Sequence, residues 1–168
     1  MVEFALLAPI LVFLVMAIVD LARVYTTSID VESAAREAAD YGTFGSQKWN
    51  PALYALPTTG TEAKMRLRAC VAASKLPDYV GPDDSCTNPV VTYDLSPDRG
   101  ATWGPYDAGM GCDTATREPP CWLRVTVHYD FRLIAPFHFD FFGVGLGLPV
   151  SIPIERSSVF PMTDLSLP

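Results

Sequence analysis

The chain opens on an uninterrupted apolar run from Phe4 to Val19, which contains no charged or polar side chain. As a helix rising about 1.5 Å per residue, this run would be about 24 Å long. A bilayer core is about 30 Å thick, but apolar residues on both sides extend the run, and Arg23 can reach the headgroups with its guanidinium. We therefore expect a transmembrane helix over residues 1–24.

Two other interpretations of the apolar run fit less well. A cleaved signal peptide would need basic residues before the run and a small-residue cleavage site after it, whereas no basic residue precedes Phe4 and residues 20–23 read Asp-Leu-Ala-Arg. A buried helix of a soluble domain normally has a polar face. Pro9 would cost a soluble helix about 3 kcal/mol, but membrane helices tolerate proline. These observations favour the membrane-spanning interpretation.

The helical pattern continues beyond the apolar run. Residues 20–41 contain neither proline nor glycine, and Gly42 is a candidate helix cap. We expect one helix over residues 3–41, with residues 25–42 as its continuation outside the membrane. Small residues recur at helical spacing on this continuation and would let a partner pack closely, either the protein's own domain or a neighbouring subunit: Ala34, Ala35, Ala38 and Ala39.

Residues 43–168 have the pattern of an α+β domain. A second helix is expected over residues 61–76, ending before Pro77. Three strands are expected over residues 90–95, 122–133 and 144–155, and the second alternates cleanly between apolar and polar positions. The predicted fold is α+β: a long N-terminal helix and a short second helix packed on one face of a small antiparallel sheet.

The last predicted strand has two further features. Pro149 and Pro153 fall in the same phase, so both missing N–H groups would face one side, as suits an edge strand. The aromatic stretch "PFHFDFFG", residues 136–143, precedes this strand and is too short and too polar to span a membrane. We expect it to cap the core or to dip into the membrane interface.

Charge and cysteine content narrow the class of protein. A net charge of −7 and a pI of about 4.6 argue against a nucleic-acid partner. The spacing of the four cysteines matches no zinc pattern, so two disulfides in an oxidising compartment are expected. Of the three possible connectivities we favour Cys70–Cys86 with Cys112–Cys121, because each closes a short local loop. Oxidised cysteines would place the domain outside the cytoplasm.

One short motif predicts a hairpin turn. Residues 96–103, "SPDRGATW", fit the Asp-box pattern S-x-D-x-G-x-T-W. Asp98 could accept backbone N–H groups within the turn, Gly100 supplies a permissive backbone, and Trp103 could pack back on the strand. Asp boxes recur in sialidase-type propellers, where they are structural and repeated. A single copy, Ser96 to Trp103, therefore does not indicate a glycosidase.

Metal binding and catalysis have little support in the sequence. "HYDF" at residues 128–131 recurs as "HFDF" at residues 138–141, and the weak candidates for ligands are His128, Asp130, His138 and Asp140. The simpler interpretation is that these are outward-facing polar residues. The chain carries no Ser-His-Asp order, phosphate loop, H-E-x-x-H or nucleotide fingerprint. We expect no enzymatic activity, no metal and no cofactor.

The opening segment, "VEFALLAPILVFLVMAIVDLAR", resembles the N-terminus of the TadE-like family (TadE/TadG), the pseudopilins of tight-adherence (Flp, type IVb-like) pilus systems. The matching features are Val2-Glu3-Phe4-Ala5, Pro9, the aliphatic tail and the exit from Asp20 to Arg23. "AAREAADYG" is similar to the helix continuation in that family. The resemblance covers about the first 40 residues and is loose beyond them. It implies a type IV pilin-like fold and a minor pseudopilin role in pilus assembly.

The resemblance also implies a location and partners. The protein would be a single-pass protein of the inner membrane with an extracytoplasmic C-terminal domain, either in a surface pilus or only aiding assembly. Its partners would be the major pilin, other pseudopilins, the platform membrane proteins, membrane lipid and, transiently, the prepilin peptidase. Subunit contacts would involve Glu3, Phe4 and Pro9.

The residues before Glu3 depart from the family pattern. In type IV pilin relatives the peptidase cuts after a glycine a few residues before such a glutamate, which the family places at the fifth mature position. Here only two residues precede Glu3, and there is no glycine or basic leader. We therefore expect a basic segment ahead of Met1 in the natural protein.

Glu3 has two interpretations. It could neutralise the N-terminal ammonium of a neighbouring subunit and so fix the axial register of stacked helices, because an unpaired charge in a low-dielectric site is costly. It could instead lie at headgroup level and favour the helix N-terminus. An alternative function for the whole chain is a membrane-anchored extracytoplasmic domain that binds glycan or metal and never enters a filament.

Overall fold

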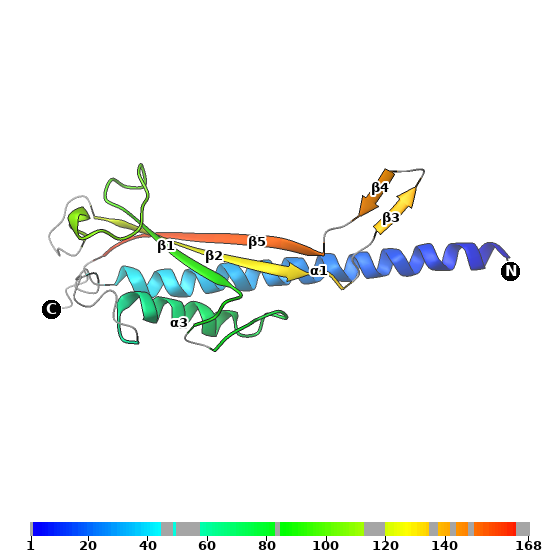
Figure 1. Ribbon diagram of the computed structural model, residues 1–168, viewed down its shortest axis with the longest axis horizontal. Helices are drawn as coiled ribbons and strands as arrows, with labels where there is room; N and C mark the ends of the chain where they lie inside the picture. Colours follow the sequence, from blue (N-terminus) through cyan, green and yellow to red (C-terminus); the bar gives the residue numbers. More distant parts are fainter. Residues whose placement is uncertain are drawn as a thin grey trace.

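The computed structural model describes residues 2–44, 49, 58–82, 85–112, 120–134, 138–141, 144–147 and 150–163. Helix α1 runs from Val2 to Thr43 and forms the long axis of the molecule (Figure 1). The prediction of one helix over residues 3–41 is confirmed. Within the described part of the chain, the segment Leu7–Thr43 is long and apolar enough to cross a membrane.

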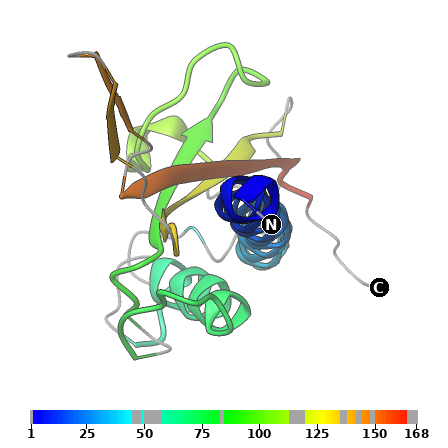
Figure 2. The ribbon, with the colours of Figure 1, turned by 90° about the vertical axis from the view of Figure 1, so that its right-hand side faces the viewer.

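A second helix and a three-stranded sheet lie along the C-terminal half of α1 (Figure 1). Helix α3 (Thr61–Ala73) lies beside it, and strands β1 (Val90–Ser96), β2 (Trp122–Arg132) and β5 (Ser151–Pro161) form an antiparallel sheet in the order β1-β2-β5. A short 3₁₀ turn, η2 (Ala108–Met110), precedes β2. Both helices lie on the same side of the sheet (Figure 2). The predicted α+β fold is confirmed.

Strand β2 supplies the centre of the core. Its odd-numbered side chains are completely buried, whereas the even-numbered ones are half-buried or exposed on the opposite face, as the alternation of the sequence predicts. The buried face of the sheet packs against α1, so the core lies between β2 and the two helices. The fully buried residues of β2 are Leu123, Val125, Val127, Tyr129 and Phe131.

The alanine stripe of α1 is buried within the protein's own domain. Ala34, Ala35, Ala38 and Ala39 are all 0% exposed and belong to the same core cluster as β2 and α3. Small side chains let the helix axis approach the sheet closely, which larger residues would prevent. Of the two partners considered for the stripe, the domain itself therefore occupies it.

Gly42 does not cap α1 as expected. The helix continues to Thr43, and Gly42 is not among the glycines with positive φ. A Cβ at this position would collide with Leu123 Cδ2 and lie 2.9 Å from Met65 Sδ. The glycine is needed here because the sheet and α3 approach the helix backbone, not because the chain turns. The indole of Trp49 donates to the Gly42 carbonyl at 2.8 Å.

The predicted bounds of the second helix and of the last strand were wrong. Helix α3 ends at Ala73 instead of residue 76, because the Ser74 hydroxyl and backbone N–H both donate to the Val71 carbonyl and close the last turn. The strand predicted over residues 144–155 is two strands, β4 (Val144–Gly147) and β5. β4 pairs with β3 (His138–Phe141) in a separate hairpin.

The edge position of the last strand is confirmed. β5 lies at one edge of the three-stranded sheet and extends to Pro161, well beyond the predicted end. Proline lacks the N–H that a second neighbour would require, so Pro153 is compatible only with such an edge. Pro149 lies outside the described residues.

Candidate functional site

The N-terminal half of α1 carries a long run of exposed apolar side chains. It projects beyond the sheet and α3 (Figure 1). Its large aliphatic side chains are about half exposed or more, as for Val15 at 60% and Ile18 at 64%. Soluble monomers rarely leave such a continuous apolar surface in water. The surface is therefore suited to lipid or to other apolar helices.

Pro9 lines a shallow apolar depression on this half of α1. Ile10, Phe13 and Leu14 form the rest of its lining, and its volume is about 490 Å³. Glu3 and Phe4 lie in the first turns of α1, but their side chains are outside the described residues. The three residues expected at subunit contacts thus share the end of the helix that projects farthest from the domain (Figure 1).

The boundary between the two halves of α1 is built around Asp20. This carboxylate is only 6% exposed; it accepts the backbone N–H of Ile134 at 3.3 Å and pairs with Arg23 at 3.3 Å. The Arg23 guanidinium lies 5.0 Å from the centre of the Phe131 ring. The sequence showed Asp20 and Arg23 only as the exit of the apolar run. Their contacts with the end of β2 depend on tertiary structure.

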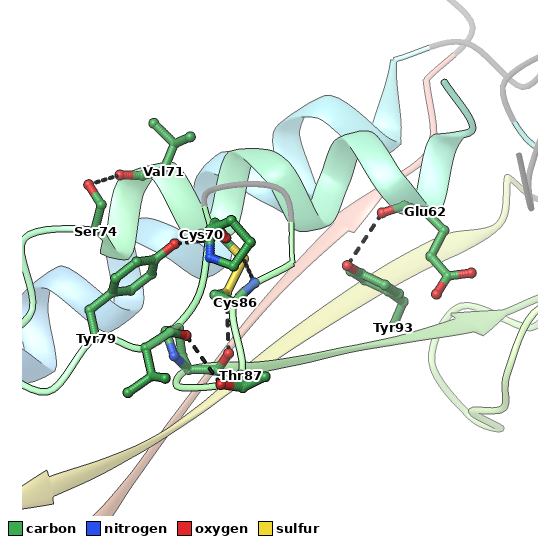
Figure 3. The surroundings of a disulfide bond; sticks show 11 residues. Glu62, Cys70, Val71, Ser74, Tyr79, Cys86, Thr87 and Tyr93 are labelled. Atoms are coloured by element: carbon green, nitrogen blue, oxygen red, sulfur yellow. Dashed lines mark hydrogen bonds between the residues drawn. A yellow bond between two sulfur atoms is a disulfide. The ribbon is translucent and has the colours of Figure 1, made fainter. Parts of the chain in front are cut away.

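Two disulfides cross-link the domain. Their pairing is the one that the sequence analysis favoured, because each bond closes a short loop. Cys70 of α3 is bonded to Cys86 in the segment before β1, and Figure 3 shows this bond beneath the helix. Cys112 is bonded to Cys121 just before β2. The Cα atoms lie 5.6 and 5.7 Å apart, and no cysteine is free. Both bonds strengthen the domain end of the molecule.

The Asp-box segment forms a compact turn after β1. Asp98 accepts the Ser96 hydroxyl at 2.7 Å, the Thr102 backbone N–H at 2.8 Å and the Thr102 hydroxyl at 2.6 Å. These hydrogen bonds, led by those from Thr102, lower the pKa of Asp98 from 3.8 to about 2. Gly100 has a φ of +92°. These hydrogen bonds lie within the turn and hold its shape.

Trp103 connects this turn to the sheet. The Arg124 guanidinium on β2 lies 4.6 Å from the centre of the Trp103 ring and pairs with Asp94 of β1 at 2.6 Å. The backbones of Leu95 and Gly104 exchange two hydrogen bonds at the base of the turn. The tryptophan thus lies over the open face of the sheet, away from α1.

The metal-ligand candidates are divided between two strands. On β2, His128 Nε2 lies 3.6 Å from Asp130 and Nδ1 lies 3.9 Å from Glu155 of β5. His138 and Asp140 lie on β3, and their side chains are outside the described residues. Among the described residues no group of three potential metal-ligating side chains comes together. Of the four candidates, the described side chains are those of His128 and Asp130, which lie close together on β2.

A polar depression of about 300 Å³ lies beside His128 and Asp130. Asp78 organises it: its backbone N–H donates to the Tyr129 hydroxyl at 3.0 Å, and its carboxylate accepts the Arg132 backbone N–H at 3.2 Å. Burial raises the pKa of Tyr129 above its ordinary value of 10. Sequence reasoning missed Asp78, because only the fold brings it to β2.

The molecule thus combines, in one N-terminal helix, a long exposed apolar segment and the spine of an α+β domain. Comparison with known families makes this more specific: residues 1–40 match the model of the TadE-like protein family. The match confirms the resemblance seen in the sequence and supports involvement in a tight-adherence pilus system. It covers most of α1 and none of the sheet. No curated protein and no solved structure matches the chain.

Proposed function

We propose that the chain is a minor, pseudopilin-like, single-pass membrane protein that takes part in assembling a tight-adherence pilus. It acts without catalysis, by packing its apolar helix among other helices and by presenting the α+β domain outside the cytoplasm. One observation carries the proposal: the helix that matches the TadE-like family is exposed and apolar in one half and buried in the domain in the other. A helix exposed in this way needs lipid or partner helices.

The proposed membrane boundary lies near Asp20 and Arg23, where α1 contacts the end of β2 and the residues after it. Residues 1–24 would then span the inner membrane, residues 25–42 would continue the helix outside the cytoplasm, and residues 43–168 would form the domain. The two disulfides support this orientation, because such bonds persist in oxidising compartments. The major pilin, other pseudopilins, the platform proteins and the prepilin peptidase are the proposed partners.

Glu3 is the residue proposed to set the register between subunits. Its carboxylate would pair with the N-terminal ammonium of a neighbouring chain, because a shifted register would leave both charges unpaired in a low-dielectric environment. Glu3→Gln keeps the size of the side chain and removes its charge. We expect this variant to enter membranes normally and to reduce pilus assembly by roughly tenfold, if the lost pairing contributes about 1.4 kcal/mol.

The experiment compares membranes with sheared surface fibres. Each fraction is probed for the protein, and its N-terminus is sequenced to identify the processed form. Asp30→Asn is the matched control, because it makes the same chemical change on an exposed residue of the same helix. Normal pilus assembly by the Glu3→Gln variant would remove the register hypothesis. Absence of the native protein from membranes would remove the whole proposal.

The polar depression beside β2 supports a second candidate function, a membrane-anchored domain that binds glycan or metal. Asn88, His128, Asp130 and Arg132 line it and offer both donors and acceptors. Titration of the full-length protein in detergent with Zn²⁺, Ca²⁺ and simple sugars tests this function. Saturable binding that is lost in His128→Ala would favour it, and pilus assembly unaffected by deletion of the gene would strengthen it.

A further inference from the structure

The β3–β4 hairpin stands apart from the main sheet. Among the described residues its two strands pair only with each other, with Phe139 opposite Leu146 and Phe141 opposite Val144. In Figure 1 the hairpin lies beyond the end of the sheet, on the side of the N-terminal half of α1, and Figure 2 shows that it is splayed away from that helix. A lone two-stranded hairpin is at best marginally stable in water. Pairing between the two strands alone therefore does not explain the stability of the hairpin.

The base of the hairpin is fixed where the apolar half of α1 ends. The Leu133 backbone N–H donates to the Val150 carbonyl at 3.2 Å and closes the base. The next backbone N–H, that of Ile134, donates to Asp20 of α1 at 3.3 Å. His138 follows Ile134 by four positions, so β3 begins within about 14 Å of that contact. The base of the hairpin therefore lies near the proposed membrane boundary.

The register gives the hairpin one apolar and one polar face. Residues two apart in a strand share a face, so Phe139, Phe141, Val144 and Leu146 occupy one face of the pair. The other face holds His138, Asp140 and two glycines.

The residues around the hairpin extend its apolar character. Ile134 and Val150 at the base are apolar and 63% and 67% exposed. The sequence from Leu133 to Val150 contains no lysine or arginine. Exposed apolar residues thus lie at the base of the hairpin, where the Ile134 backbone contacts Asp20.

We propose that the β3–β4 hairpin is a second membrane attachment, lying in the interfacial region of the bilayer that α1 spans. The face with Phe139 and Phe141 meets the acyl chains, and the face with His138 and Asp140 meets headgroups and water. This inference rests on the proposed function, because only a membrane-spanning α1 brings lipid to this level. Phenylalanine and leucine on one face and polar residues on the other are typical of elements that lie in an interface.

Lipid is the occupant favoured by the neighbouring surface of α1. Leu21 and Tyr25, which follow the apolar run, are 71% and 69% exposed. Tyrosine is enriched at the membrane–water interface, so Tyr25 and the hairpin would lie at similar depth on one side of the bilayer. Attachment at α1 and at the hairpin would limit the tilt and rotation of the domain relative to the membrane.

The test places a tryptophan on the hairpin of the full-length protein in phosphatidylcholine–phosphatidylglycerol vesicles. Phe139→Trp and Phe141→Trp put the probe on the apolar face, and Asp140→Trp puts it on the polar face. Lipids brominated near the headgroup end or near the methyl end of the acyl chains quench tryptophan according to depth. We expect both apolar-face probes to lose most of their added emission to the shallow quencher, and the polar-face probe to lose much less.

Two controls separate this inference from the proposed function. Leu14→Trp reports on the spanning helix, and Val159→Trp reports on the far end of β5, which pairs with Arg124. If Leu14→Trp is quenched and the Phe139→Trp probe behaves like Val159→Trp, the hairpin inference fails and the anchor stands. Equal quenching of both hairpin faces also overturns it. If Leu14→Trp is not quenched, the membrane-spanning proposal fails and the hairpin inference fails with it.

Discussion

The two halves of helix α1 have the same backbone but different surroundings. Val15 in the N-terminal half is 60% exposed, whereas Val31 in the C-terminal half is 0% exposed. Large aliphatic residues dominate the first half, and alanines line the buried side of the second. Where the helix meets its own sheet, side-chain size is limited by a rigid neighbour. Where it is exposed, fluid lipid chains could adapt to bulky residues.

The strongest test of this difference makes the same substitution in each half of α1. Val31→Asp buries an unpaired carboxylate in the core and should lower the free energy of unfolding by roughly 3–5 kcal/mol. Val15→Asp should leave the domain stable and should disfavour membrane insertion by about 2.5–3.5 kcal/mol. Near-ultraviolet circular dichroism in detergent measures the first effect, and alkaline extraction of membranes measures the second.

The opposite pattern would refute the comparison. If Val15→Asp unfolded the domain, the N-terminal half would be part of the core, not an anchor. If Val31→Asp left the unfolding midpoint unchanged, α1 would not be the spine of the domain.

The second prediction concerns Gly42, near the C-terminal end of α1, where the helix packs closely against the sheet and α3. Gly42→Ala adds a methyl group that would collide with Leu123 and press on Met65. We expect overpacking to lower the free energy of unfolding by about 1–3 kcal/mol, measured by urea unfolding. Leu123→Val removes the colliding atom, so the double variant should lose less than the sum of the two single losses. Simple additivity would show that Gly42 serves some purpose other than close packing.

The third prediction concerns the buried hydroxyl of Tyr129. Tyr129→Phe loses the hydrogen bond from the Asp78 backbone and should cost about 0.5–1.5 kcal/mol at neutral pH. The folded-state pKa of Tyr129 is raised, so above pH 10 the unfolded chain loses this proton first and the wild type loses stability. The difference in the free energy of unfolding between wild type and Tyr129→Phe should therefore shrink as the pH rises above 10. Tyr25→Phe, at an exposed position, is the control for removing a tyrosine hydroxyl.

The smallest expected effect concerns the Asp-box turn at the end farthest from the anchor. The pKa of Asp98 is lowered to about 2, so its contribution to stability is present above pH 3.8 and is lost as the pH falls toward 2. Asp98→Ala should lower the thermal midpoint slightly at neutral pH and have no effect below about pH 2. Thr102→Val removes the leading donor without changing charge and should reduce the same acid-sensitive contribution. A constant difference between wild type and Asp98→Ala at every pH would contradict this assignment.

Local patterns in the sequence determined much of this protein. The apolar run and the absence of proline and glycine after it predicted α1, and strict alternation predicted β2 and its buried face. The short loops between cysteines favoured the observed pairing. Residues 2–5 and Pro9 carried the resemblance to the TadE-like family. These features depend on neighbours in the chain, where spacing alone specifies what each residue meets.

Tertiary structure decided what depends on distant contacts. The segment from residue 144 to 155 alternates without a break, yet it divides into two strands because β3 and β2 each offer it a different partner. Gly42 looked like a helix cap, but Leu123 and Met65 set its role. Asp20 accepts a hydrogen bond from the backbone of Ile134, more than a hundred residues later in the chain. Sequence spacing cannot report such contacts, because they form only when remote segments pack together.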